Sequence, residues 1–402
     1  MSQPPPRIAR IVLVTPDGGP LGVLPDFAVD LPWWQEVWPL VEGARARFGA
    51  AITVLRMLGV GEPREAGVVV TYLAETPEPA PAAALPWDGV LDDQPLRLPY
   101  ATPGGPAADL TWAANVLAGH GLAFDKPPFQ VRTWNLSSLW RLSAGGKTFW
   151  LKVTPPFMAF EGALIEALAG GPVPTLMGRD GGRILMPEIA GEDCYGATEP
   201  LLSRMVDLIV PLQRDWAGRT GELLQLGLND WRAPALAAAI TATFERNAGQ
   251  LAPEVRARLA PFVETLERRL ADAAACGPSD TLVHGDFHPG NLRCDGAALT
   301  LLDWGDAGVG HPLLDEPAFL ERIAAEDAPR LRDRWHVAWR AAAPGSDPGR
   351  ASALLAPIAA LRQAVVYQGF LDRIEPSEHP YHRADPPERL ARAAAMLAAE
   401  RL

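Results

Sequence analysis

The stretch from 281 to 306 constrains the fold and chemistry of this chain more than any other. An apolar run ends in His-Gly-Asp, and Asn291 follows Asp286 after Phe-His-Pro-Gly. Two further apolar runs flank Asp295-Gly296, a dipeptide typical of a tight β-hairpin. We therefore expect a strand, a polar loop and a hairpin that ends at Asp303.

This order of elements predicts that three oxygen-bearing side chains converge. Pro289-Gly290 bends the chain so that Asn291 turns back towards Asp286, and the hairpin returns Asp303 to the same edge. Hard oxygen donors without a His or Cys ligand suit Mg²⁺. We expect Asp286 to orient an acceptor hydroxyl and to take its proton. We expect Asn291 and Asp303 to hold metal ions that bridge the phosphates of ATP.

An upstream pair of residues is expected to bind nucleotide phosphates. Lys152 lies on an expected strand and is one of three lysines in the chain, and Glu161 follows at the start of an expected helix. A lysine held by a glutamate in this arrangement is typical of the small lobe of a kinase. The pair therefore predicts a fixed positive charge on the α- and β-phosphates.

Two loops are expected to complete the nucleotide site. The first lies between two expected strands and contains Ser137 and Ser138, whose hydroxyls and backbone N–H groups can cover the phosphates. The second, 187–191, contains Glu188 and Ile189; it is expected to link two lobes and to offer backbone groups to adenine.

Together, the His-Gly-Asp-x-x-x-x-Asn stretch, the Leu-Leu-Asp-Trp-Gly-Asp stretch and the Leu-Lys strand with its Glu-bearing helix resemble the aminoglycoside phosphotransferase and choline kinase family. The resemblance runs from about Phe129 to the C-terminus. It implies an α+β, bilobal protein-kinase-like fold with ATP in the cleft. It also implies the same roles for the catalytic aspartate, the metal ligands and the phosphate-binding pair: Asp286, Asn291, Asp303, Lys152 and Glu161.

The acceptor site is predicted less sharply. Asp306 and Asp315 match acidic positions that follow the second metal ligand in that family, and Asp230 and Glu192 are further candidates on the helical lobe. An acidic pocket favours an amino alcohol, an aminosugar or an aminoglycoside-like acceptor. A catalytically silent nucleotide-binding regulatory module remains the alternative to a small-molecule kinase, and a metal-dependent phosphohydrolase is a third possibility.

The bulk composition excludes several classes of protein. The formal net charge is −12 over 402 residues, which argues against nucleic-acid binding. The three cysteines form no C-x-x-C pair, so a structural zinc site is not expected. We find no signal-peptide pattern and no apolar run of about 18 residues, so we expect a cytoplasmic protein without a membrane partner.

Proline-rich punctuation divides the chain into three expected regions. These are an N-terminal α/β extension (1–127), a kinase-like small lobe (128–190) and a mostly helical large lobe with the catalytic loop and acceptor site (191–402).

The extension is expected to contain strands at 8–14, 52–58 and 67–72 and a helix at 32–48. The helix–glycine–strand order around Gly49 is similar to that of a Nudix fold. The paired glutamates of such enzymes are missing here, so the sequence assigns this region no chemistry.

Overall fold

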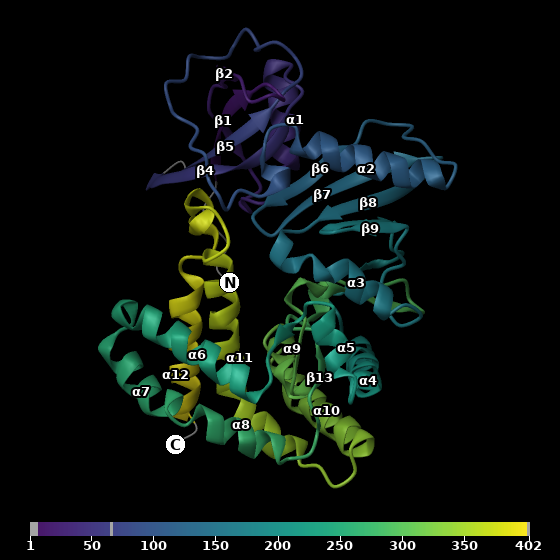
Figure 1. The fold of residues 1–402 in the computed structure, drawn as a ribbon, viewed down its shortest axis with the longest axis vertical. Helices are drawn as coiled ribbons and strands as arrows, with labels where there is room; N and C mark the ends of the chain where they lie inside the picture. The colour runs from purple at the N-terminus through teal and green to yellow at the C-terminus, as the bar shows by residue number, and fades with distance from the viewer. Residues whose placement is uncertain (1–6, 65–66, 400–402) are drawn as a thin grey trace. The chain divides into compact units, whose positions relative to one another are not determined.

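The computed structural model describes residues 7–64 and 67–399, which form two compact units of mixed helix and sheet (Figure 1). Unit 1 comprises Met1–Gly162, Leu176–Glu188 and Leu371–Arg383. Unit 2 comprises Ala163–Thr175, Ile189–Phe370 and Ala384–Leu402. Each unit combines the helices and sheets of the expected α+β class.

The first sheet of unit 1 has the order β2-β1-β5-β4. β2 pairs with the C-terminal half of β1, and β3 pairs with its N-terminal half. β1 and β5 run parallel, and the other pairs are antiparallel. The strands are β1 (Arg7–Val14), β2 (Pro20–Val23), β3 (Phe27–Val29), β4 (Thr53–Arg64) and β5 (Gly67–Glu75). The three strands that the sequence predicted here are confirmed.

Both faces of this sheet are covered because side chains alternate between them. Ile11 and Leu13 point into a core that includes α1 (Trp38–Phe48). Val12 and Val14 point to the other face, where Trp87 and Leu91 pack. The long connection after β5 therefore serves as the second cover of the sheet.

Helix α1 begins at Trp38, so the prediction of a helix from 32 was wrong over its first six residues. Pro39 lies in the first helical turn, where a missing N–H costs nothing, and it disfavours helical geometry just before it. The preceding segment instead pairs with the next sheet: Glu36 forms a β-bridge with Arg132, and Val37 N–H donates to Val131 O.

The second sheet of unit 1 has the order β6-β7-β8-β10-β9. The strands are β6 (Phe129–Trp134), β7 (Ser137–Ala144), β8 (Lys147–Val153), β9 (Gly178–Asp180) and β10 (Arg183–Pro187). Helix α2 (Gly105–Gly119) lies across this sheet (Figure 1) and buries Ala113 and Leu117 against Trp140 and Leu151. The short helices η1 (Pro99–Ala101) and η2 (Pro156–Met158) and the helix α3 (Phe160–Ala167) complete this part of the chain.

Residues 371–383 join unit 1 although the sequence placed them with the large lobe. They contain η7 (Pro376–Tyr381), which packs against β4. Tyr381 lies against the core of the first sheet and makes an edge-to-face contact with Trp34. The position of this short polar and aromatic segment is therefore set by side-chain contacts with the first sheet. Local sequence patterns do not predict such contacts.

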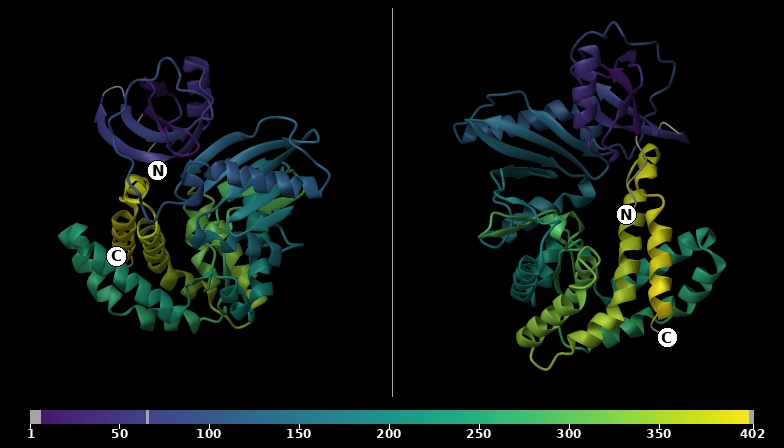
Figure 2. Two further views of the ribbon diagram at one scale, coloured as in Figure 1. Left: turned by 45° about the horizontal axis from the view of Figure 1, so that its top comes forward. Right: turned by 180° about the vertical axis from the view of Figure 1, so that it is seen from behind.

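Unit 2 is mostly helical. Its longer helices are α4 (Glu199–Trp216), α6 (Ala233–Asn247), α7 (Pro253–Val263), α8 (Leu266–Ala274), α10 (Ala328–Ala342), α11 (Pro348–Leu371) and α12 (Asp385–Ala399). α10 packs on α4, and α12 packs on α6 and α7. α11 and α12 lie side by side in each view (Figures 1 and 2).

Helix α11 is the single helix in the described part of the chain that is long and apolar enough to cross a membrane. The protein buries 56% of its most apolar window, as expected of the core helix of a globular unit.

Two small sheets in unit 2 carry the loops of interest. Their orders are β11-β14-β15 and β12-β16-β13. The strands are β11 (Glu192–Asp193), β12 (Asn229–Asp230), β13 (Thr281–Val283), β14 (Leu292–Cys294), β15 (Leu299–Leu301) and β16 (Gly308–Gly310). The short helices are α5 (Thr220–Gln225), η3 (Ala248–Gln250), η4 (Pro289–Asn291), η5 (Trp304–Asp306), η6 (Pro312–Leu314) and α9 (Glu316–Leu320). The predicted hairpin is confirmed as β14 and β15.

Candidate active site

His284 is the first residue of the loop after β13, and its side chain holds the loop in place. Its Nδ1 accepts the N–H of Asp286 at 3.3 Å, so the proton resides on Nε2, which donates to Leu302 O at 2.9 Å. The imidazole is fully buried, and burial lowers the pKa of His284. A neutral His284 therefore ties the loop to the end of the β14–β15 hairpin.

Asp315, a predicted acceptor residue, lies beneath this loop and is fully buried. Its two oxygens accept the N–H groups of His284 and Gly285, both at 2.8 Å, and Oδ2 also accepts Gln213 Nε2 at 2.9 Å. Burial raises the pKa of Asp315, and the hydrogen bonds from the backbone N–H groups of Gly285 and His284 lower it again in part. The geometry favours a role in bracing the loop over contact with an acceptor.

Gly285 is required by the close approach of two loops. Its φ is +90°, and a Cβ there would lie 2.1 Å from the backbone oxygen of Asp306. Its own carbonyl accepts Arg362 Nη2 from α11 at 2.6 Å. The close approach of Gly285 to Asp306 O places the loop against η5, which carries the half-buried Asp306.

Asp286 and Asn291 lie together, as the bend at Pro289-Gly290 predicted. Asn291 Nδ2 donates to Asp286 O at 2.9 Å and to Asp286 Oδ2 at 3.3 Å. His288 Nε2 lies 3.3 Å from the same carboxylate oxygen, while its Nδ1 accepts Gly290 N–H. The carboxylate of Asp286 is therefore held by two neighbours and remains 37% exposed.

The pKa of Asp286 is lowered to about 2. Burial acts to raise it, but the hydrogen bond from His288 and the positive charge of Arg322 help to outweigh burial. Asp286 is therefore an ionised hydrogen-bond acceptor at any physiological pH.

Asp303 has a backbone conformation that is unusual for its residue type. Its φ of 60° and ψ of 66° are left-handed, and among the residues that the structure describes it is the one non-glycine with positive φ. Such a conformation disfavours most side chains and recurs at functional sites. Leu302 N–H donates to Asn291 O at 2.8 Å. This bond ties the residue before Asp303 to Asn291, the other predicted metal ligand.

The donor set fits a magnesium ion better than a transition metal. Within residues 7–64 and 67–399, no three His, Cys, Asp or Glu side chains gather closely enough to hold a metal ion. Because Asn291 uses its Nδ2 towards Asp286, its amide oxygen is left to face a cation. One carboxylate and one amide oxygen suit Mg²⁺, which keeps waters and takes phosphate oxygens as further ligands.

In unit 1, Lys152 on β8 and Glu161 on α3 form the predicted pair. Lys152 Nζ lies 2.7 Å from Glu161 Oε1, and the two side chains are 15% and 2% exposed. The chain reaches this geometry because β8 places Lys152 near the start of the helix that follows it.

The residues of the two predicted nucleotide loops form hydrogen bonds within the protein. Ser137 Oγ accepts the indole N–H of Trp134 at 3.1 Å, and the buried Ser138 Oγ accepts that of Trp140 at 3.0 Å. These bonds favour a structural role for the two hydroxyls. In the second loop, Glu188 in unit 1 donates its N–H to Thr148 O, and Ile189 O in unit 2 accepts Arg293 Nε at 3.1 Å.

The remaining acceptor candidates differ in their surroundings. Asp230 lies 2.7 Å from Arg232, and the hydrogen bond with Arg232 lowers the pKa of Asp230. Glu192 is exposed on β11. Sequence reasoning missed Arg362 and Gln213 because a helix pattern does not distinguish a buried polar side chain from an exposed one.

Comparisons with known proteins bear on the family and the fold of the chain. A family model described as the phosphotransferase enzyme family matches residues 132–354, more than half of the chain. No curated protein sequence matches the chain. The structure is similar to that of an apo macrolide 2′-phosphotransferase from Brachybacterium faecium, with a TM-score of 0.51 and 19% identity over 69% of this chain and 97% of that one.

A second solved structure, a type I macrolide 2′-phosphotransferase, has a TM-score of 0.50 and 18% identity over 72% of this chain and 97% of that one. At such identities the likeness concerns the fold. The predicted protein-kinase-like fold is confirmed.

Proposed function

Because the chain belongs to the phosphotransferase enzyme family, we propose that it transfers the γ-phosphate of ATP to a hydroxyl group of a small molecule. One observation carries the proposal. The Asp286 carboxylate is ionised, partly exposed and held by Asn291 and His288 on a loop braced by buried polar groups. Phosphoryl transfer needs mainly positioning and charge stabilisation, and such a loop supplies the first.

Asp286 would accept a hydrogen bond from the acceptor hydroxyl and so aim its oxygen at the γ-phosphorus. As the new P–O bond forms and the bond to the ADP oxygen breaks, the hydroxyl proton passes to this carboxylate or onward to solvent. A carboxyl group with a pKa of about 2 is a weak base, so orientation is its larger contribution.

Asn291 and Asp303 would hold Mg²⁺, which supplies positive charge to the phosphate oxygens when it is bound. Lys152 would contact the α- and β-phosphates. Glu161 is nearly fully buried, and its Oε1 lies 2.7 Å from Lys152 Nζ. It would keep the ammonium group in one position before the nucleotide binds.

For the acceptor we propose an amino alcohol, an aminosugar or an aminoglycoside-like compound. The formal net charge of −12 and the acidic side chains of Asp306, Asp230 and Glu192 favour a cationic substrate. The same charge disfavours nucleic acid as a partner. We further propose a cytoplasmic location without a membrane partner.

The test is ATP consumption by the full chain with Mg²⁺ against separate pools of aminoglycosides, amino alcohols, aminosugars and neutral sugars. Asp286→Asn should lower acceptor-dependent turnover by about a hundredfold or more, because it removes the charge that orients the hydroxyl. Asp333→Asn, at an exposed position on α10, is the matched control and should leave turnover unchanged.

Binding of Mg·ADP, measured by calorimetry, should survive in Asp286→Asn. Undiminished turnover in that variant would refute the role of Asp286. Nucleotide binding without consumption in any pool would favour the regulatory module, and phosphate release without an acceptor would favour a phosphohydrolase.

A further inference from the structure

Unit 1 contains a cavity that the candidate active site does not use. Its volume is about 370 Å³, and all of its lining residues belong to unit 1. Its walls come from β4, β5, the connection after β5 and the start of η7, and they include Arg56, Arg97 and Glu375. This volume is in the range of small-molecule sites.

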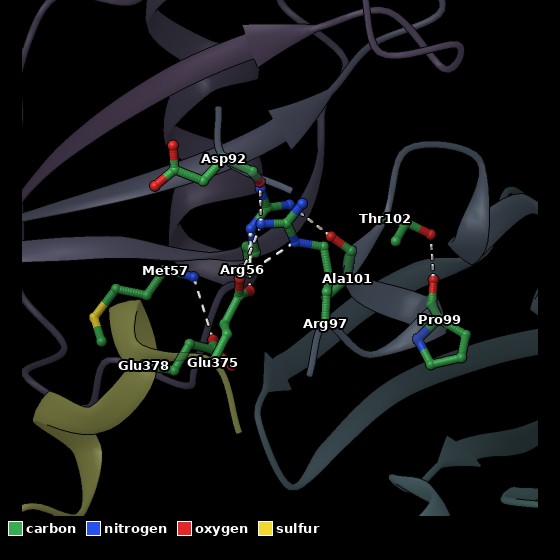
Figure 3. Close-up of polar contacts among 9 residues, drawn as sticks. All are labelled: Arg56, Met57, Asp92, Arg97, Pro99, Ala101, Thr102, Glu375 and Glu378. Carbon is green, nitrogen blue, oxygen red and sulfur yellow. Dashed lines mark hydrogen bonds and ion pairs between the residues drawn. The ribbon is translucent and has the colours of Figure 1, made fainter. Parts of the chain in front are cut away.

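Two arginines meet at one carboxylate in this cavity (Figure 3). Arg97 donates from Nε at 3.2 Å and from Nη2 at 3.0 Å to Glu375 Oε2, and Arg56 Nε lies 3.2 Å from Glu375 Oε1. The side chains of Arg56 and Glu375 are 3% and 4% exposed. A fully buried arginine at a cavity wall is costly unless its charge and donors are used.

The donors of Arg56 are incompletely used. Nη1 donates to Ala101 O at 2.8 Å. Nε lies 3.2 Å from Glu375 Oε1 without hydrogen-bond geometry and is buried with no hydrogen-bond partner among the described residues. A buried guanidinium group beside a cavity, with its N–H donors incompletely satisfied, can gain hydrogen bonds from a bound oxyanion.

The charge balance also favours an anion. Two guanidinium groups share the single negative charge of Glu375. The neighbouring Glu378 adds little charge at neutral pH, because burial, followed by the charge of Glu375, raises its pKa to about 8. The exposed Asp92 carboxylate points away from the guanidinium groups, and it is the Asp92 backbone oxygen that accepts Arg97 Nη2 (Figure 3).

The rest of the wall is suited to an apolar body. Trp87 and Leu91 cover the second face of the first sheet, and Leu58 packs with them. All three residues also line the cavity. We propose that this cavity binds a small organic anion, with its carboxylate or phosphate group at Arg56 and Arg97 and its apolar or aromatic part against Trp87 and Leu91.

The experiment measures binding to the full chain by calorimetry with three probes of one shape. Phenyl phosphate and benzoate carry the two candidate oxyanions, and benzylamine is the cationic counterpart. We expect the anions to bind and benzylamine not to bind, and the tighter anion identifies the preferred group. Arg97→Gln should weaken anion binding about ten- to a hundredfold. Arg10→Gln, whose arginine pairs with Asp26 at an exposed position in unit 1, should have no effect.

Because Arg97→Gln also removes a partner of Glu375, a second pair of variants keeps this contact intact. Gln94 lines the cavity and is half-buried. Gln94→Glu should weaken binding of the anions several-fold, and Gln94→Lys should tighten it by a similar factor. Failure of both anions to bind would overturn the proposal. Binding that ignores the changes at Arg97 and Gln94 would also overturn it, because the probe would then occupy another site.

Discussion

Glu378 offers a test of how unit 1 responds to pH. The residue is 2% exposed, and its carboxyl group accepts the N–H of Met57 on β4 at 3.4 Å. Burial, followed by the charge of Glu375, raises its pKa from 4.5 to about 8. We expect Glu378→Gln to remove a pH dependence of stability that the wild-type chain carries.

The sign follows from proton binding. In the unfolded chain the carboxyl group ionises near pH 4.5, whereas in the native protein it keeps its proton up to about pH 8. Between these values the native state binds more protons than the unfolded state, so the free energy of unfolding falls as pH rises. Each pH unit is worth about 1.4 kcal/mol, which sets an upper limit of roughly 5 kcal/mol over the window. We expect roughly 2–4 kcal/mol, because local relaxation and water penetration offset part of the burial.

The assay is urea unfolding at pH 5, 6, 7 and 8. Relative to Glu378→Gln, the wild type should lose stability steadily across this series. The amide side chain of that variant would keep an oxygen for the Met57 N–H, so packing is preserved. Glu62→Gln, at an exposed position of β4, is the control and should run parallel to the wild type. Parallel curves for the wild type and Glu378→Gln would refute the assignment of a buried, protonated carboxyl group.

Three further predictions concern other contacts. Gly285→Ala should destabilise unit 2 by about 2 kcal/mol or more, since its Cβ would lie 2.1 Å from Asp306 O at a φ of +90°; an unchanged urea midpoint would contradict this. Asp315→Asn should lower stability by about 1–3 kcal/mol, because an amide nitrogen would face backbone donors; calorimetric melting measures it, and a wild-type Tm would count against the bracing role. Arg183→Leu should cost about 1–3 kcal/mol, since it leaves the Asp109 carboxylate, now 2.7 Å from Arg183 and 4% exposed, without its cation; restored stability in the double variant with Asp109→Asn would confirm the cause.

The sequence by itself determined the parts of the fold that depend on local patterns. Apolar runs around Asp295-Gly296 predicted the β14–β15 hairpin, and the chain order predicted that Asn291 returns to Asp286. The pairing of Lys152 with Glu161 was also predictable, because a strand and the helix that follows it are neighbours in space. In each case the partners are close in sequence, so turn chemistry and strand periodicity suffice.

The tertiary structure alone decided which polar residues became buried and paired. Asp315 was expected at the acceptor site, yet it lies fully buried beneath the loop, where backbone N–H groups use both of its oxygens. The contact of Met57 with Glu378 joins residues 321 positions apart, and the cavity at Arg56 exists through the same long-range contact of η7 with β4. Local patterns report the period of the backbone. They do not report which distant carboxylate neutralises a buried arginine, because that pairing is set by how the elements pack.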